Sequence, residues 1–148
     1  MRFFFYGTLM DADVRRAVLG PAAPATVEPA TLAGWRRVPV AGASYPMVVR
    51  AAGSRIEGVL VRGLDGRARD LLIAYEGDGY RMLETIVTAA ISQKRCRAFV
   101  FVPDRRGRSK TPPKRGRGAW ILASWRRRHK RRFLARLASA ASAPLADK

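Results

Sequence analysis

The chain has 148 residues, of which 48% are hydrophobic and 27% are charged, a composition typical of a single globular domain and not of a disordered chain. Its one cysteine, Cys96, excludes an internal disulfide and a zinc site built on cysteine pairs. We expect a reducing compartment and a cytoplasmic location, because no apolar run resembles a signal peptide or reaches the roughly 18 residues of a membrane span.

The net charge of +18 is concentrated toward the C-terminus. Residues 1–104 hold 14 Lys/Arg and 10 Asp/Glu, whereas residues 105–148 hold 15 Lys/Arg and a single acid, Asp147. The excess charge is therefore a property of the C-terminal region and does not describe the chemistry of the rest of the chain.

The N-terminal segment predicts a strand, a loop and a helix. Residues 2–6 are mostly aromatic and end at Gly7, which favours a short buried strand followed by a tight loop. Asp11 or Asp13 is placed to cap the helix that follows, and Gly20 with the next proline ends it.

The middle of the chain predicts a curved sheet. Residues 22–30 are rich in alanine and proline and predict an extended connection. Short strands bent at glycine and proline are then expected over residues 31–40, 41–49 and 56–61. A helix is predicted over residues 67–75 and ends at a turn with two glycines.

The last third predicts two strands, a loop and a helix. Residues 85–91 and 95–102 are expected to form paired strands, followed by a basic Gly/Pro-rich loop over residues 103–118. Residues 119–141 predict a basic amphipathic helix, and residues 142–148 are expected to be a frayed tail. The apolar stripe of the helix, in which the histidine is expected to be packed, consists of Leu122, Trp125, His129, Phe133 and Leu137.

The first candidate site is the segment Tyr6-Gly7-Thr8-Leu9, directly after the first predicted strand. Glycine there permits a backbone geometry that other residues resist, and such a loop is able to aim backbone N–H groups at a ligand carboxylate. The hydroxyl of Thr8 would lie beside them. An ordinary turn at the end of a strand is the alternative, so these four residues do not define a site by themselves.

The second candidate is Glu76, which lies between Tyr75 and Tyr80 at a predicted helix end, beside glycines that let a small molecule approach. Partial burial would raise the pKa of this carboxyl toward the range useful to a general acid/base. The alternative is a solvated glutamate at a helix end, which is the commoner fate of a glutamate.

The order of these segments resembles a known family. The matching segments are Tyr6-Gly7-Thr8-Leu9, Gly34-Trp35-Arg36, Tyr45-Pro46, Ile56-Glu57-Gly58-Val59-Leu60 and Tyr75-Glu76-Gly77, with Tyr80 shortly after. Over residues 3 to 102, their order and spacing are similar to those of the gamma-glutamylcyclotransferase-like proteins, which include gamma-glutamylamine cyclotransferases and plant avirulence-induced relatives.

The resemblance implies an α+β fold: a small mixed β-barrel of about five to seven strands over residues 1–102, flanked by helices, with the basic C-terminal helix packed on it. It implies an enzyme without cofactor or metal that releases 5-oxoproline and an amine or amino acid from a gamma-glutamyl substrate. Tyr6, Gly7, Thr8 and Leu9 would hold the substrate's α-carboxylate and amino end. Glu76 would be the catalytic acid/base.

Three further aromatic residues, Trp35, Tyr45 and Tyr80, are candidates for lining a cavity, although aromatic side chains in a chain of this length are commonly core residues. Of the three, we expect Tyr80 to contact substrate. Cys96 lies between two arginines in a predicted strand with no histidine near it in sequence, which favours a small buried side chain over a nucleophile.

A binding module on a catalytically inactive barrel is the alternative function. Residues 105–136 hold 14 cations and no acid, interleaved with Trp120, Trp125 and Phe133, so nucleic acid or another anionic surface is a candidate partner. A basic amphipathic helix is also able to lie on an anionic membrane, unless Trp125, Phe133 and Leu137 are buried in the domain. As an enzyme, we expect a monomer that binds a small gamma-glutamyl compound.

Overall fold

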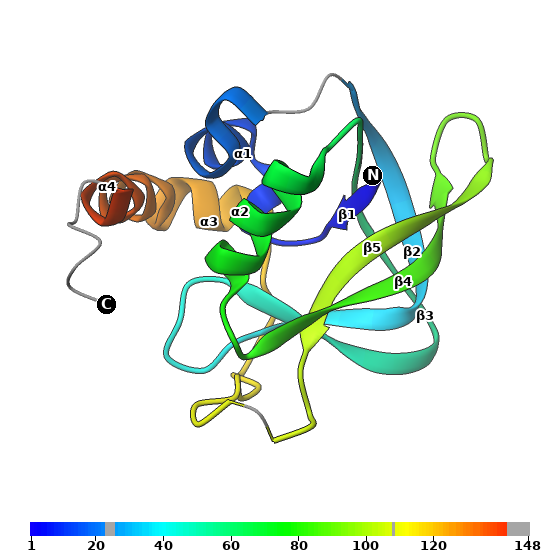
Figure 1. The fold of residues 1–148 in the computed structure, drawn as a ribbon. Helices are drawn as coiled ribbons and strands as arrows, with labels where there is room; N and C mark the ends of the chain where they lie inside the picture. The colour runs from blue at the N-terminus through cyan, green and yellow to red at the C-terminus, as the bar shows by residue number, and fades with distance from the viewer. Residues whose placement is uncertain (23–25, 108, 142–148) are drawn as a thin grey trace.

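The computed structural model describes residues 1–22, 26–107 and 109–141. In this part of the chain, five strands close into a barrel in the order β1, β3, β2, β4, β5, and four α-helices lie together on one side of it (Figure 1). The pairing of β1 with β5 is parallel and the others are antiparallel. The predicted α+β fold with a small mixed barrel is confirmed. The predicted frayed tail, residues 142–148, lies outside the described residues.

Strand β1 (Phe3–Phe5) separates two apolar cores. Because successive side chains of a strand point to opposite faces, Phe4 joins the core inside the barrel, while Phe3 and Phe5 join the core between the barrel and the helices. All three side chains are buried. The loop that follows β1 therefore starts where the two cores meet.

Strands β2 (Thr26–Pro39) and β3 (Pro46–Arg62) form one long hairpin. The strands predicted over residues 31–40 and 56–61 overlap β2 and β3 but are shorter than these. Residues 26–30, predicted as a connection, belong to β2, and residues 41–45, predicted as part of a strand, form the turn. The register shifts between Ala33 and Trp35, where Gly34 has a φ of +86°. A bulge at such a glycine bends and twists a strand without ending it, so the pattern of breakers marks bends inside continuous strands.

Helix α1 (Ala12–Leu19) begins where the sequence predicts, and Asp11 is its cap. The Asp11 carboxylate accepts hydrogen bonds from the backbone N–H of Asp13 at 2.9 Å and from that of the next residue at 3.2 Å. A short 3-10 helix η1 (Thr8–Met10) precedes α1, and another, η2 (Gly20–Ala22), follows it. The chain thus passes from β1 into α1 within a few residues.

Helix α2 (Gly66–Glu76) and strand β5 (Arg95–Pro103) agree with the predicted helix and second strand within one residue at each end. Strand β4 (Tyr80–Ala89) begins five residues earlier and ends two residues earlier than the predicted strand. The helix ends because Gly77 has a φ of +80°, a conformation that glycine adopts without strain. The chain turns there and enters β4, which pairs with β5 along its whole length. This turn fixes the last residue of α2 against the end of the barrel.

Between β5 and α3, the described residues form no helix and no strand beyond one isolated bridge. This basic loop is nevertheless bonded to the turn between β2 and β3. The carbonyl of Lys114 accepts a hydrogen bond from the N–H of Ala41 at 2.8 Å, and the indole of Trp120 donates one to the carbonyl of Ser44 at 2.8 Å. The loop therefore packs along one end of the barrel.

The predicted single C-terminal helix is two helices, α3 (Leu122–Arg128) and α4 (Lys130–Ala141), which meet at His129. His129 has a φ of −128° and a ψ of −24°, and its side chain is exposed, whereas the sequence predicts a packed histidine. Phe133 packs edge-on against Trp125 across this junction, with ring centroids 5.4 Å apart. Helical spacing alone does not reveal this break.

Asp11 also holds the C-terminal helices to the N-terminal part of the chain. Its side chain is 1% exposed, and Oδ2 accepts from Nε of Arg126 at 2.8 Å and from Nζ of Lys130 at 2.9 Å. Burial by itself would raise the pKa of Asp11, but hydrogen bonds from Lys130, Arg126 and the Val14 amide outweigh it and lower the pKa. The anchor is therefore ionised at neutral pH.

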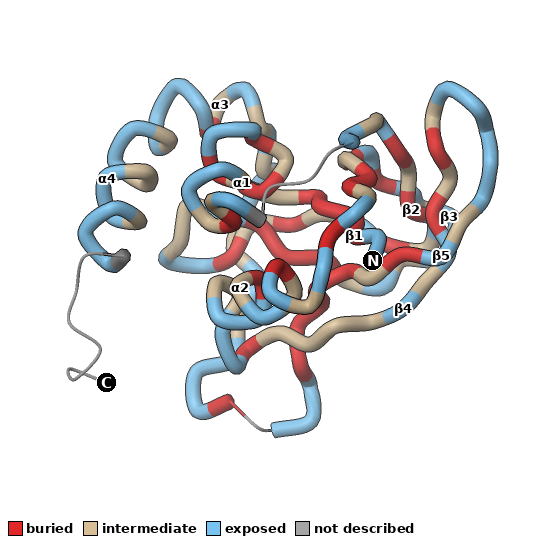
Figure 2. The backbone as a smooth tube through the Cα atoms, turned by 45° about the horizontal axis from the view of Figure 1, so that its top comes forward, coloured by how far each residue is buried: buried red, intermediate tan, exposed pale blue. Residues whose placement is uncertain are grey.

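The apolar side of α3 and α4 faces the protein. Trp125 is buried, and Phe133 and Leu137 are partly buried in the core between barrel and helices. Figure 2 shows α4 with exposed and intermediate positions only. Of the apolar side chains that a membrane-bound helix would need, Trp125 is thus covered by the protein, and Phe133 and Leu137 are covered in part. No helix in the described ranges is long and apolar enough to cross a membrane.

Candidate active site

One pocket, with a volume of about 400 Å³, brings the two candidate motifs together. Tyr6, Gly7, Thr8 and Leu9 line it from the loop after β1, Glu76 lines it from the end of α2, and Tyr80 lines it from the start of β4. The other lining residues come from the barrel, the β2–β3 turn, α2 and α4: Phe4, Phe5, Tyr45, Pro46, Ala74, Tyr75, Phe101, Phe133, Leu137 and Ala140.

The loop has backbone N–H groups without a partner in the residues that the structure describes. The amide N–H groups of Gly7, Thr8 and Leu9 donate no hydrogen bond elsewhere in the described part of the chain. Gly7 has a φ of −123° and a ψ of −138°. A side chain at this position would meet the ring of Pro46, because a Cβ added at Gly7 would lie 3.1 Å from two of its carbons.

The two hydroxyl groups of this loop are bonded within the protein. Tyr6 donates its phenolic hydrogen to the carbonyl of Phe101 at 2.7 Å, and Thr8 Oγ1 lies 2.7 Å from the hydroxyl of Tyr75. Arg37, which sequence reasoning missed, donates from Nε to the carbonyl of Tyr6 at 2.7 Å. These bonds fix the loop and leave its N–H groups as the donors for a ligand.

Glu76 is the one carboxyl among the described residues that line the pocket, and none of these residues is Lys or Arg. Burial raises its pKa from an ordinary value of 4.5 to about 8. A carboxyl group with a pKa near neutrality is able both to accept and to donate a proton at physiological pH. The site therefore has a proton-transfer group beside a set of backbone donors.

Tyr80 has a hydroxyl that is buried and has no partner among the described residues. Burial, together with the nearby Glu76, raises its pKa. An unpaired buried hydroxyl is costly, and a ligand in the pocket would supply the missing partner. Burial likewise raises the pKa of Tyr75, although its hydrogen bond with Thr8 opposes this shift.

Sequence reasoning identified some of the other lining residues and missed the rest. Of the three aromatic candidates, Tyr45 and Tyr80 line the pocket, whereas Trp35 is buried inside the barrel. Phe133 and Leu137 were recognisable as members of an apolar stripe, but periodicity does not tell a cavity wall from a packed core. In the described part of the chain, no cluster of three or more His, Cys, Asp or Glu is arranged to hold a metal ion.

Comparison with known proteins identifies the class. The family described as Gamma-glutamyl cyclotransferase, AIG2-like matches residues 3–122, and the chain therefore belongs to this family. AIG2-like protein B of Arabidopsis thaliana is 26% identical over 133 residues, covering 88% of this chain and 72% of that protein.

Solved structures show the same fold. The solution structure of At5g39720.1 from Arabidopsis thaliana has a TM-score of 0.67 and 23% identity, and covers 97% of this chain and 93% of that one. A structure described as Gamma-glutamyl cyclotransferase has a TM-score of 0.63 and 14% identity, with 93% and 85% covered. At these identities the likeness establishes the fold alone.

Proposed function

We propose that the protein is a gamma-glutamyl cyclotransferase-type enzyme that converts a gamma-glutamyl substrate to 5-oxoproline and a free amine or amino acid. The observation that supports this most strongly is the position of Glu76, whose pKa is raised to about 8, in the same pocket as the loop Tyr6-Gly7-Thr8-Leu9. Family membership agrees with this chemistry.

The reaction needs proton transfers and no cofactor. The α-ammonium of the gamma-glutamyl group gives a proton to the Glu76 carboxylate, and the resulting amine attacks the γ-carbonyl carbon of the same molecule. Glu76 returns this proton to the leaving nitrogen as the amide C–N bond breaks. The second proton of the attacking nitrogen then passes through Glu76 to the released amine, which leaves as an ammonium ion. General acid/base catalysis of this kind contributes roughly 10²- to 10⁴-fold, and the intramolecular attack depends on holding the chain in a folded orientation.

Substrate binding is assigned to the loop. The N–H groups of Gly7, Thr8 and Leu9 would hold the α-carboxylate, because no cation lines the pocket among the described residues. The unpartnered hydroxyl of Tyr80 would donate to a substrate oxygen. Backbone donors that face a developing oxyanion are commonly worth a further 10²-fold or so.

The test is an assay of the full chain with a panel of gamma-glutamyl amines and dipeptides, in which 5-oxoproline is measured. We expect turnover with at least one class of substrate and its loss in Glu76→Gln. Glu84→Gln is the matched control, because Glu84 is an exposed carboxylate on β4 that does not line the pocket. Absence of 5-oxoproline across the panel would refute the proposed activity.

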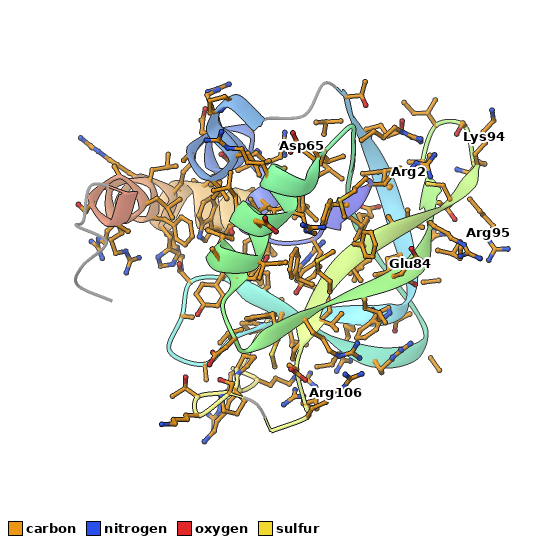
Figure 3. The ribbon with its side chains drawn as sticks, viewed as in Figure 1. Arg2, Asp65, Glu84, Lys94, Arg95 and Arg106 are labelled. Atoms are coloured by element: carbon orange, nitrogen blue, oxygen red, sulfur yellow. The ribbon has the colours of Figure 1, made fainter. Side chains whose placement is uncertain are left out.

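A second candidate function, binding of nucleic acid, is favoured by the surface of α3 and α4. Their outer side carries Arg127, Arg128, Arg131, Arg132 and Arg136, all of them exposed. Other cations lie elsewhere: Figure 3 shows Lys94 and Arg95 at the turn between β4 and β5, and Arg106 at the other end of the barrel. The helical arginines are therefore the place where several phosphates would be neutralised together.

Binding of a labelled single-stranded oligonucleotide across a salt series tests this second function. The affinity should fall steeply with salt, because each phosphate contact releases a counterion. The double change Arg131→Glu with Arg132→Glu should weaken binding much more than the charge-matched change Lys94→Glu with Arg95→Glu. Equal effects of the two double variants would mean that only the net charge matters.

A further inference from the structure

Helix α4 supplies one side of the pocket. Phe133, Leu137 and Ala140 follow the spacing i, i+4, i+7, so they share one face of the helix. All three line the same pocket as Glu76. The family match ends at residue 122. The α4 side of the pocket is therefore made by residues that the matched segment does not include.

This side is held in place by packing and by ion pairs. The ring of Phe133 packs edge-on against the ring of Tyr75, with ring centroids 6.4 Å apart. The hydroxyl of Tyr75 in turn forms a hydrogen bond with the hydroxyl of Thr8. At the start of the helix, Nζ of Lys130 lies 2.9 Å from the buried carboxylate of Asp11. Because α4 is tied both to the loop and to α1, its apolar face has a defined position relative to the proposed substrate anchor.

The α4 side of the pocket is apolar, and the polar groups of the lining come from other elements. They include the loop N–H groups, Glu76 and the hydroxyls of Thr8, Tyr45, Tyr75 and Tyr80. The proposed reaction assigns the loop N–H groups, Glu76 and the Tyr80 hydroxyl to the gamma-glutamyl head. The α4 residues and Pro46 offer carbon atoms only. A volume of about 400 Å³ lies in the range of pockets for drug-sized ligands, roughly 300–1,000 Å³. Room therefore remains for a substrate part beyond the head.

We propose that α4 makes the enzyme select gamma-glutamyl compounds whose amine portion is apolar and uncharged. This inference rests on the proposed cyclotransferase function and names its substrate class. An alkyl or aryl group would pack against Phe133 and Leu137, whereas an ammonium or carboxylate placed against them would lose water without gaining an ion pair from the α4 residues that line the pocket. Each buried methylene should strengthen binding about fourfold.

The experiment measures binding separately from turnover. Gamma-glutamyl n-alkylamides from methyl to pentyl, and the amide of 1,4-diaminobutane as the cationic analogue, are titrated by calorimetry into the full-length Glu76→Gln chain. The same compounds are offered to the unmodified chain and 5-oxoproline is measured. We expect affinity to rise about three- to fourfold per methylene and the cationic amide to bind at least about tenfold more weakly than the pentylamide.

Changes in α4 should alter this preference. Leu137→Ala should flatten the dependence on chain length, and Leu137→Glu should favour the cationic amide. Ala135→Glu adds the same charge at an exposed position of α4 that does not line the pocket. It should change neither the dependence of affinity on chain length nor the binding of the cationic amide. Melting temperatures of all variants report whether each one folds, and Leu137→Ala keeps the test interpretable if the Glu variant does not.

The outcomes separate the two proposals. Affinity that follows chain length without any 5-oxoproline would support the selectivity and refute the reaction. If all amides were converted at equal rates and bound with the same affinity whatever their chain length, the reaction would be supported and the selectivity overturned. Equal binding of the cationic amide and the pentylamide, or no binding of any compound, would also overturn it.

Discussion

The hydroxyl groups of Thr8 and Tyr75 lie 2.7 Å apart and form a hydrogen bond. This bond joins the loop after β1 to the last turn of α2, one residue before Glu76. It also uses the Thr8 hydroxyl, which is therefore a brace between two parts of the pocket. The distance between the proposed substrate anchor and the proposed acid/base depends on it.

Removing either hydroxyl should loosen this geometry. Thr8→Val and Tyr75→Phe keep the side-chain shapes and are each expected to cost about 1 kcal/mol of stability, with a several-fold loss in kcat/KM. The double variant should be hardly worse than either single one, because both changes remove the same bond. Fully additive losses in kcat/KM would mean that the two hydroxyls act independently.

The Tyr80 hydroxyl should behave differently, since it has no partner among the described residues. Tyr80→Phe removes a buried unpaired polar group, so the melting temperature should stay the same or rise. If the hydroxyl donates to substrate, KM should rise by roughly tenfold, the value of one hydrogen bond. An unchanged KM would show that Tyr80 contributes only its ring to the pocket.

Local patterns in the sequence were sufficient for the elements that are bounded by strong signals. The aromatic run before Gly7 predicts β1, an acid at position 11 or 13 predicts the start of α1, and Gly77 predicts the end of α2. The association of the loop with Glu76 in one pocket came from the order of the motifs along the chain, since no local pattern connects residues so far apart.

What the sequence could not provide are features that depend on contacts between distant residues. Gly34 looks like a strand end, but the partner strand continues past it, and the result is a bulge. The apolar stripe around His129 runs on without interruption although the helix breaks there. The hydrogen bonds of Thr8 and of Arg37 are made with residues that sequence spacing does not pair.

Gly58 tests the close contact between β1 and β3. A Cβ added there would lie 2.3 Å from the carbonyl oxygen of Phe5 and 2.6 Å from Cζ of Phe4. Gly58→Ala should therefore destabilise the fold by about 3 kcal/mol or more, above the usual cost of overpacking. Gly66→Ala is the control, because only the Arg69 side chain lies near, at 3.6 Å. Gly66→Ala should raise the free energy of unfolding, measured in urea, by up to about 1 kcal/mol.

Asp11 tests the attachment of the C-terminal helices. Asp11→Asn keeps an oxygen that caps α1 but removes the charge that binds Arg126 and Lys130, and should cost about 1–3 kcal/mol. Because the folded pKa of Asp11 is lowered, its contribution is present above the ordinary value of 3.8 and is lost as the pH falls through the folded pKa.

Melting temperatures between pH 2 and 7 measure this contribution. The difference between the original chain and Asp11→Asn should be constant near neutrality and disappear at the acid end. Asp70→Asn is the control, since the ion pair of Asp70 is with the adjacent Arg69 and its side chain is 69% exposed. A difference that persists unchanged at pH 2 would mean that the carboxylate charge is not what holds α3 and α4.

Glu76→Gln should separate chemistry from stability. The Gln side chain keeps the shape and the hydrogen-bonding capacity of Glu76 but exchanges no proton, so kcat should fall by about 10²-fold or more while substrate still binds. In the original chain, kcat/KM should rise with pH through an apparent pKa near 8, the value to which burial raises this carboxyl, because the carboxylate form accepts the ammonium proton.

Rising pH changes the stability through Glu76 in the opposite direction to its effect through Asp11. Between the ordinary value of 4.5 and the folded pKa of about 8, the folded chain keeps a proton on Glu76 that the unfolded chain has released. Rising pH therefore costs stability over this window, by a few kcal/mol at most, and the cost is constant above it. The Gln variant has no such cost, so its advantage in melting temperature should grow from pH 5 to pH 8 and then stop growing. Full activity of the variant would rule out Glu76 as the proton-transfer group, and a variant that melts lower at pH 8 would show that the carboxylate stabilises the fold.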